Sequence, residues 1–321
     1  MILAFFQIIA GLGLLVYGAD KFVNGASGLA RRLGVPPIII GMSVVGVATS
    51  IPEVLVGSVA ALNGKTHIAI GNALGSNIAN MGLVLGGTAV IMPMVARSDT
   101  LLREYKVMCI AMLAALLILL DLDLSRTDGI ILLLALAVVS AWIFHVARTS
   151  PGTDPLAREY EKEFRAETTV ARSLLILVFG LGLLLAGAEI LVRGAVFVAE
   201  FFGISDLVIG LTVIAVGTSL PELAASIMSV LKDEADIAIG NVIGSNIFNM
   251  LMVLGVPPLI HPDSFGFEVL WRDFSVMVIL TVLMGIMVFL RGHGRFDRGE
   301  GALLLSGFLA YQSWLFFAAT G

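Results

Sequence analysis

The second half of this chain repeats the first half, with a shift of about 169 residues. Residues 41–62 read GMSVVGVATSIPEVLVGSVAAL, and residues 210–231 read GLTVIAVGTSLPELAASIMSVL. Residues 67–86 read HIAIGNALGSNIANMGLVLG, and residues 236–255 read DIAIGNVIGSNIFNMLMVLG. About half of the aligned positions are identical, without a gap. Two apolar helices do not share Pro, Glu, Asn and Ser positions by chance, so we interpret the chain as an internal duplication.

Apolar residues dominate the composition. Of the 321 residues, 58% are hydrophobic and 13% are charged, and the mean hydropathy is +1.01. A soluble domain carries about a quarter charged residues, so this composition excludes a conventional cytosolic enzyme. The alternating pattern of a membrane barrel is absent, and a membrane-crossing helix needs about 20 apolar residues. We therefore predict an all-α membrane protein with ten spans, at about 2–22, 36–62, 68–95, 104–121, 127–147, 171–192, 205–230, 237–260, 271–291 and 300–318.

Each half of the chain holds five of these spans. Because five is odd, the second half starts on the other side of the membrane, which predicts two inverted five-helix repeats. We place the first repeat at 1–147 with its motif at 41–86, a polar linker at 148–170, and the second repeat at 171–321 with its motif at 210–255.

The distribution of Lys and Arg predicts the orientation. With the N-terminus outside, only four of the 19 Lys and Arg residues fall in outer loops: Lys65, Arg126, Arg193 and Arg272. Cytoplasmic loops of membrane proteins are enriched in Lys and Arg. We therefore expect a multi-pass protein of the plasma (inner) membrane with both termini outside and the central linker in the cytoplasm.

Glu53 and Glu222 occupy matching positions inside apolar spans. An isolated ionised carboxylate is costly there, and neither helical segment contains a Lys or Arg, so a transported cation is the simplest counter-charge. Each Glu follows a proline, and a proline removes a hydrogen-bond donor from its helix. We expect carbonyl groups around residues 46–48 and 215–217 to be left free as ligands for a hard cation.

Polar residues recur beside each glutamate. Thr49 and Thr218 precede Glu53 and Glu222 by four residues and so share their helix faces. A stripe with the same spacing follows in the next span of each half: Asn72, Ser76 and Asn80, then Asn241, Ser245 and Asn249. We expect the last two residues of each stripe to face the cation, and the Gly71–Gly75 and Gly240–Gly244 pairs to admit a neighbouring helix.

All these ligands present oxygen, which suits calcium or sodium. Zinc, copper or iron sites need His or Cys, and the four histidines and the single Cys109 lack metal-ligand spacing. We expect no cofactor, no nucleic-acid partner and no obligate protein partner besides the lipid bilayer. An enzyme is not expected, since no nucleophile and base motif is present.

The two pairs of blocks, GMSVVGVATSIPE with GLTVIAVGTSLPE and GNALGSNIAN with GNVIGSNIFN, resemble the repeats of the calcium/cation antiporter superfamily, of the bacterial sodium/calcium exchanger type. The resemblance covers nearly the whole chain. It implies ten helices in two inverted repeats, with ion sites between the second, third, seventh and eighth helices.

Carried over by position, the resemblance implies calcium ligation by Glu53 and Glu222 with the carbonyls of Thr49 and Thr218. It implies sodium sites from Ser50, Ser219, Ser76, Ser245 and the carbonyls of Gly46 and Ala215, with Asn80 and Asn249 completing the central region. Potassium-dependent relatives typically carry Asp at the position of Asn249, so Asn disfavours potassium cotransport.

The predicted function is sodium/calcium antiport, in which calcium leaves in exchange for sodium by alternating access at one shared site. The first and sixth helices are expected to slide against a fixed core. A calcium/proton antiporter is an alternative in which the two Glu residues bind protons. A cation channel is an alternative of another class, although an inverted repeat around a buried site is more typical of a transporter.

Overall fold

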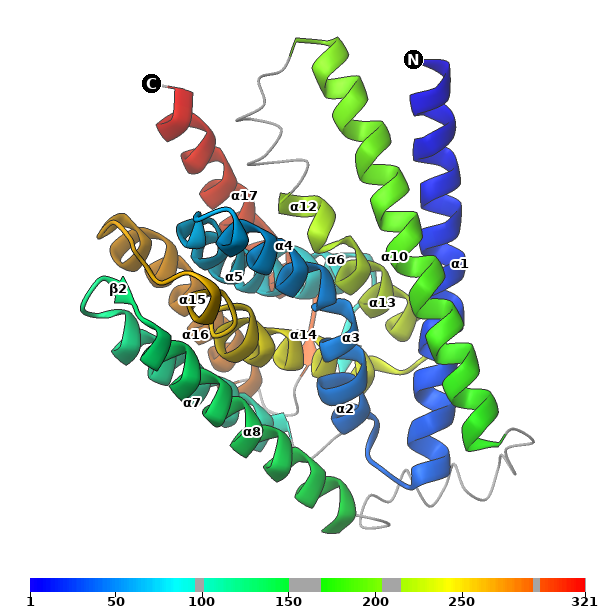
Figure 1. The fold of residues 1–321 in the computed structure, drawn as a ribbon. Helices are drawn as coiled ribbons and strands as arrows, with labels where there is room; N and C mark the ends of the chain where they lie inside the picture. Colours follow the sequence, from blue (N-terminus) through cyan, green and yellow to red (C-terminus); the bar gives the residue numbers. More distant parts are fainter. Residues whose placement is uncertain (96–100, 150–168, 204–214, 291–294, 321) are drawn as a thin grey trace.

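A computed structural model describes residues 1–95, 101–149, 169–203, 215–290 and 295–320 (Figure 1). The first half contains α1 (Ile2–Leu33), α2 (Pro37–Ile40), η1 (Gly41–Val45), α3 (Gly46–Thr49), α4 (Ile51–Leu62), α5 (Thr66–Ala79), η2 (Asn80–Gly86), α6 (Gly87–Ile91), β1 (Met94–Val95), α7 (Leu101–Leu119), β2 (Asp123–Leu124) and α8 (Arg126–Thr149), where η denotes a π-helical segment. The second half contains α10 (Val170–Phe201), α12 (Ala215–Thr218), α13 (Leu220–Leu231), α14 (Ala235–Phe248), η4 (Asn249–Val253), α15 (Pro257–Ile260), β3 (Asp263–Ser264), η5 (Val269–Phe274), α16 (Ser275–Leu290), β4 (Arg295–Phe296) and α17 (Arg298–Thr320).

Each predicted span coincides with helical structure in the described residues. Within the part of the chain that the structure describes, seven helical segments are long and apolar enough to cross a membrane: Ile2–Leu33, Pro37–Leu62, Thr66–Ile91, Arg126–Ala147, Val170–Phe201, Ala235–Ile260 and Val269–Val288. The other three predicted spans correspond to α7, to α12 with α13, and to α17. The start of the seventh span and most of the predicted linker, 148–170, lie outside the described residues.

The first and sixth helices are longer than predicted. Their apolar stretches predicted ends near residues 22 and 192, but α1 continues to Leu33 and α10 to Phe201. Helix α1 ends where Gly34 adopts a left-handed conformation, φ 62° and ψ 28°, and donates its backbone N–H to Ala30 O. Asp20 and Lys21 therefore lie within the helix, because the backbone leaves the helical conformation only at Gly34.

Helices α1 and α10 pack side by side in opposite directions along one edge of the molecule (Figure 1). Glycines recur every seven residues along both contact faces: Gly11, Gly18 and Gly25 on α1, and Gly180, Gly187 and Gly194 on α10. A Cβ atom at any of these positions would lie within 3.0 Å of the partner helix, mostly of its backbone. The missing side chains let the two helices approach closely.

Two short strand pairs connect the halves and follow their internal symmetry. Strand β1 pairs with β4 antiparallel, and β2 pairs with β3 antiparallel. Shifting β1 by the repeat length places it on β3, so each strand pair is the approximate counterpart of the other. These strands were not predicted, because two residues are too few to form a recognisable pattern in the sequence.

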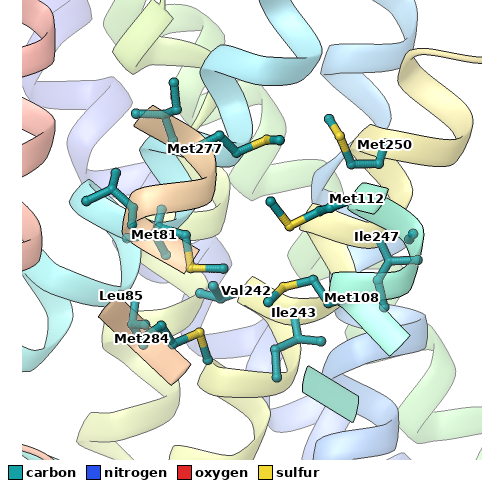
Figure 2. Close-up of a cluster of buried hydrophobic side chains, with 14 of the residues drawn as sticks. Met81, Leu85, Met108, Met112, Val242, Ile243, Ile247, Met250, Met277 and Met284 are labelled. Carbon is teal, nitrogen blue, oxygen red and sulfur yellow. The ribbon is translucent and has the colours of Figure 1, made fainter. Parts of the chain in front are cut away.

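Helix α14 lies near the centre of the fold, where 13 of its 14 residues are buried, compared with 12 of the 32 residues of α1. It packs against α7 and η2, and its aliphatic residues belong to a cluster of buried methionines and aliphatic side chains that also includes residues of α16 (Figure 2). The start of α1 and the end of α17 lie at the same end of the molecule (Figure 1), as an even number of spans requires.

Candidate cation-binding site

The two Pro-Glu motifs lie at breaks in their spans. Ser50 separates α3 from α4 with φ −84° and ψ 4°, and Ser219 separates α12 from α13 with φ −89° and ψ 1°. Each following helix begins with a proline in its first turn, where the missing N–H costs nothing. Glu53 and Glu222 also lie in these first turns, where the helix dipole favours negative charge.

Both carboxylates are buried and close to one another. Glu53 is 1% exposed and Glu222 is 2% exposed. Among the described residues, both Glu53 oxygens and Oε2 of Glu222 lack a hydrogen-bond partner, and neither residue takes part in an ion pair. Glu222 lies close enough to Glu53 for the two carboxylates to interact electrostatically. The site therefore concentrates negative charge that a cation can balance.

Two asparagines fix the backbone at the glutamates. Asn72 Nδ2 donates to the carbonyl of Glu53 at 3.0 Å, and Asn241 Nδ2 donates to the carbonyl of Glu222 at 3.3 Å. Both bonds span 19 residues, as the duplication requires. Both asparagines belong to the predicted polar stripes, but their anchoring role was not predicted. The equal 19-residue separation in the two repeats is the signal that could have suggested it.

The repeats also contact each other at the site. Thr49 Oγ1 lies 3.2 Å from Asn241 Oδ1, and Ser245 Oγ lies 3.4 Å from the carbonyl of Gly46. That carbonyl also accepts the backbone N–H of Ser50 at 3.2 Å. The expectation that proline leaves the Gly46 carbonyl without donors is therefore wrong, because the break occurs at Ser50, two residues before the proline.

The structure places the other predicted ligands as follows. Ser76 is buried on α5, and Ser219 is buried between α12 and α13. Asn80 and Asn249 are buried at the first positions of η2 and η4. Asn80 Oδ1, both amide atoms of Asn249, and Ser50 Oγ have no partner among the described residues. Thr218 and Ala215 lie on α12, where Thr218 is half-buried.

The predicted glycine contacts are confirmed for one repeat. A Cβ on Gly240 or Gly244 would lie 2.4 or 2.1 Å from the carbonyl oxygen of Ile38 or Met42, so α14 crosses the second span at backbone contact. Gly71 and Gly75 have no neighbour within 4 Å among the described residues. Their expected partner, by symmetry, falls in 204–214, outside the described residues, so that contact stays a prediction.

The donors of this site are hydroxyl, amide and carbonyl oxygens around two carboxylates. Within the described residues, no group of three or more His, Cys, Asp or Glu side chains forms a metal cluster. Such an oxygen set suits a weakly held, hard cation that enters and leaves. Broken helices, inverted repeats and a buried candidate ion site are together typical of a secondary transporter.

Comparisons with known proteins agree with this class. The model of the sodium/calcium exchanger protein family matches residues 3–145 and 172–317. The inner membrane protein YrbG of Escherichia coli is 42% identical over 99% of this chain and 98% of its own length. The sodium/calcium exchanger MaX1 of Methanosarcina acetivorans is 32% identical, covering 98% of both chains.

The solved structure of the sodium/calcium exchanger from Methanococcus jannaschii superposes with a TM-score of 0.83 at 33% identity, covering 97% of this chain and 98% of that one. The chain belongs to the sodium/calcium exchanger family. It is a multi-pass membrane cation antiporter rather than an enzyme, and its fold of ten helices in two inverted repeats is the predicted one.

Proposed function

We propose that this antiporter exports calcium in exchange for sodium, by alternating access at the site between Glu53 and Glu222. The observation that carries the proposal is the pair of buried, neighbouring carboxylates without a cationic side chain in contact among the described residues. Two negative charges balance one calcium ion or two sodium ions. The two species then compete for one site, and this competition couples their movements. Two relatives, one similar in sequence and one similar in structure, are named sodium/calcium exchangers, which supports this choice of ions.

In this proposal, calcium is bound by Glu53 and Glu222 with the carbonyls of Thr49 and Thr218. Sodium is bound with the help of the following residues: Ser50, Ser219, Ser76, Ser245 and the carbonyls of Gly46 and Ala215. Asn80 and Asn249 supply amide oxygens between the repeats. The Gly46 carbonyl accepts the Ser50 N–H, and the hydroxyl groups of Ser245 and Thr49 each lie 3.4 Å from it, so sodium bound there would replace these longer hydroxyl contacts.

The proposed location is the inner membrane, with both termini outside and the segment 148–170 in the cytoplasm. The charge distribution among the loops supports this orientation, and the Escherichia coli relative is named an inner membrane protein.

The test is radioactive calcium uptake into sodium-loaded proteoliposomes. Wild type is compared with Glu222→Gln, which keeps the shape of the side chain and removes its charge. Glu200→Gln is the matched control, because Glu200 lies exposed near the end of α10. We expect uptake in wild type and in Glu200→Gln that requires internal sodium, and loss of uptake in Glu222→Gln, because one carboxylate cannot neutralise a divalent ion.

Other driving ions distinguish the alternatives. Uptake driven by a pH gradient without sodium would replace the proposal with calcium/proton exchange. Calcium flux that needs no counter-ion gradient would indicate a channel. Sodium-dependent uptake that survives in Glu222→Gln would contradict the assigned site.

A further inference from the structure

Two buried methionines accept hydrogen bonds from asparagines beside the site. Asn246 Nδ2 donates to Met108 Sδ at 3.8 Å, and Asn77 Nδ2 donates to Met277 Sδ at 3.5 Å. All four side chains are at most 1% exposed. The two contacts are related by the 169-residue shift, because Asn77 and Met108 of the first half correspond to Asn246 and Met277 of the second half. The arrangement therefore occurs once in each repeat.

The first of these contacts continues towards the site through a second amide. Asn80 Nδ2 lies 3.5 Å from Asn246 Oδ1, so the chain of donors runs from Asn80 through Asn246 to the sulfur of Met108. At the other end, Asn80 Oδ1 is buried without a partner among the described residues. Asn80 lies about two helical turns after Asn72, whose side chain contacts the Glu53 carbonyl, and it belongs to the same polar stripe.

The chemistry of the thioether fixes the direction in which this series of hydrogen bonds runs. A thioether sulfur accepts hydrogen bonds and cannot donate, whereas an amide side chain does both and can turn end for end. If Asn246 turned, its oxygen would face the acceptor sulfur of Met108, and its NH2 group would face the NH2 group of Asn80. Asn80 would then have to turn as well, and would present hydrogens instead of an oxygen to the cation.

We propose that Met108 and Asn246 are positioning residues, which orient the Asn80 amide so that its oxygen faces the transported cation. The inference rests on the proposed function for the identity of the cation, and it concerns residues that do not themselves touch the ion. Leucine at position 108 would keep the volume of the side chain and remove the acceptor. Both orientations of the Asn246 and Asn80 amides would then be populated. The affinity for the cation would fall in proportion to the fraction of molecules in which the Asn80 oxygen faces the ion.

The methionine cluster supplies a matched control. Met284 on α16 is fully buried in the same cluster as Met108 (Figure 2), and its sulfur accepts no hydrogen bond among the described residues. Met284→Leu therefore reproduces the change in packing without a change in amide orientation.

The experiment measures calcium binding to purified protein and the kinetics of calcium uptake for three single variants and one double variant. We expect Met108→Leu to raise the calcium dissociation constant and KM about two- to fivefold, with an unchanged maximal rate. We expect Met284→Leu to stay within about twofold of wild type. In an Asn80→Ala background, Met108→Leu should have no further effect, because its influence passes through Asn80.

Equal affinities of Met108→Leu and Met284→Leu would overturn the proposal, and so would a full Met108→Leu effect in the Asn80→Ala background. If wild type binds no calcium, the proposed ion is wrong. The same variants compared by sodium binding then decide the role of Met108 separately.

Discussion

Gly18→Ala is expected to force apart the two helices that form the edge of the molecule. The added Cβ would lie 2.4 Å from the backbone nitrogen of Leu184 and 2.8 Å from its Cα. Ordinary contacts between such atoms are about 3.5 Å, so the helices must separate locally by about 1 Å. Because the contacted atoms belong to the backbone, no change of side-chain rotamer can relieve the overlap.

Gly13→Ala is the matched control on the same helix, since a Cβ there meets nothing within 4 Å. Alanine is the better helix former by about 1 kcal/mol at both positions. Overpacking costs about 1–3 kcal/mol, and it applies only to position 18. The difference in unfolding free energy between the two variants therefore isolates the overpacking term, and we expect about 1–3 kcal/mol in favour of Gly13→Ala.

The assay is reversible unfolding by SDS in mixed micelles, followed by circular dichroism. The partner helix allows an independent repeat of the experiment. A Cβ on Gly187 would lie 2.5 Å from the nitrogen of Leu15, whereas one on Gly182 has no neighbour within 4 Å. Equal unfolding free energies for Gly13→Ala and Gly18→Ala, and likewise for Gly182→Ala and Gly187→Ala, would refute the close approach of α1 and α10.

Two further predictions concern polar contacts outside the cation site. Glu234, which accepts hydrogen bonds from Ser27 at 2.7 Å and Arg31 at 2.8 Å, ties the loop before α14 to α1. Glu234→Gln should lower the unfolding free energy by about 1 kcal/mol in the SDS assay, and an unchanged value would contradict this anchoring. At Asp263, burial raises the pKa, but the hydrogen bonds from His67 outweigh it and hold the pKa below its usual value of 3.8. A carboxyl group whose pKa is lowered in the folded state stabilises the protein above about pH 4, and this stabilisation is lost as the pH falls through the folded-state pKa. His67→Ala should therefore reduce the drop in melting temperature between about pH 5 and about pH 3. Equal drops in wild type and His67→Ala would refute the contact.

Much of the fold could be predicted because membrane helices are encoded locally. Hydropathy located the ten spans, and five spans per half required inversion. The duplicated Pro-Glu motifs also marked the breaks, although the exact position of each break was missed. Turn geometry at Ser50 and Ser219 sets it, and a serine carries no distinctive signal for that conformation.

Helix ends and π-helical segments were less predictable. Asp20 and Lys21 resemble a helix end in a hydropathy profile, yet α1 continues past them to Leu33, and Asp20 forms an ion pair with Lys232 at 2.6 Å from within the helix. The π-helical segments that begin at Asn80 and Asn249 were not predicted, because one extra residue in a turn leaves the apolar pattern nearly unchanged.

The sequence by itself determined the duplication, the number of spans, their inversion and the residue types of a cation site, since each of these depends on composition or on spacing along the chain. Only the tertiary structure decided which glycines contact a neighbouring helix, which asparagines anchor the glutamate backbone, and which sulfur accepts from Asn246. The physical reason is that these contacts join segments up to about 200 residues apart, such as Ser245 with Gly46 and Asn246 with Met108. Their partners are chosen by helix packing in three dimensions, which the periodicity of a single helix does not encode.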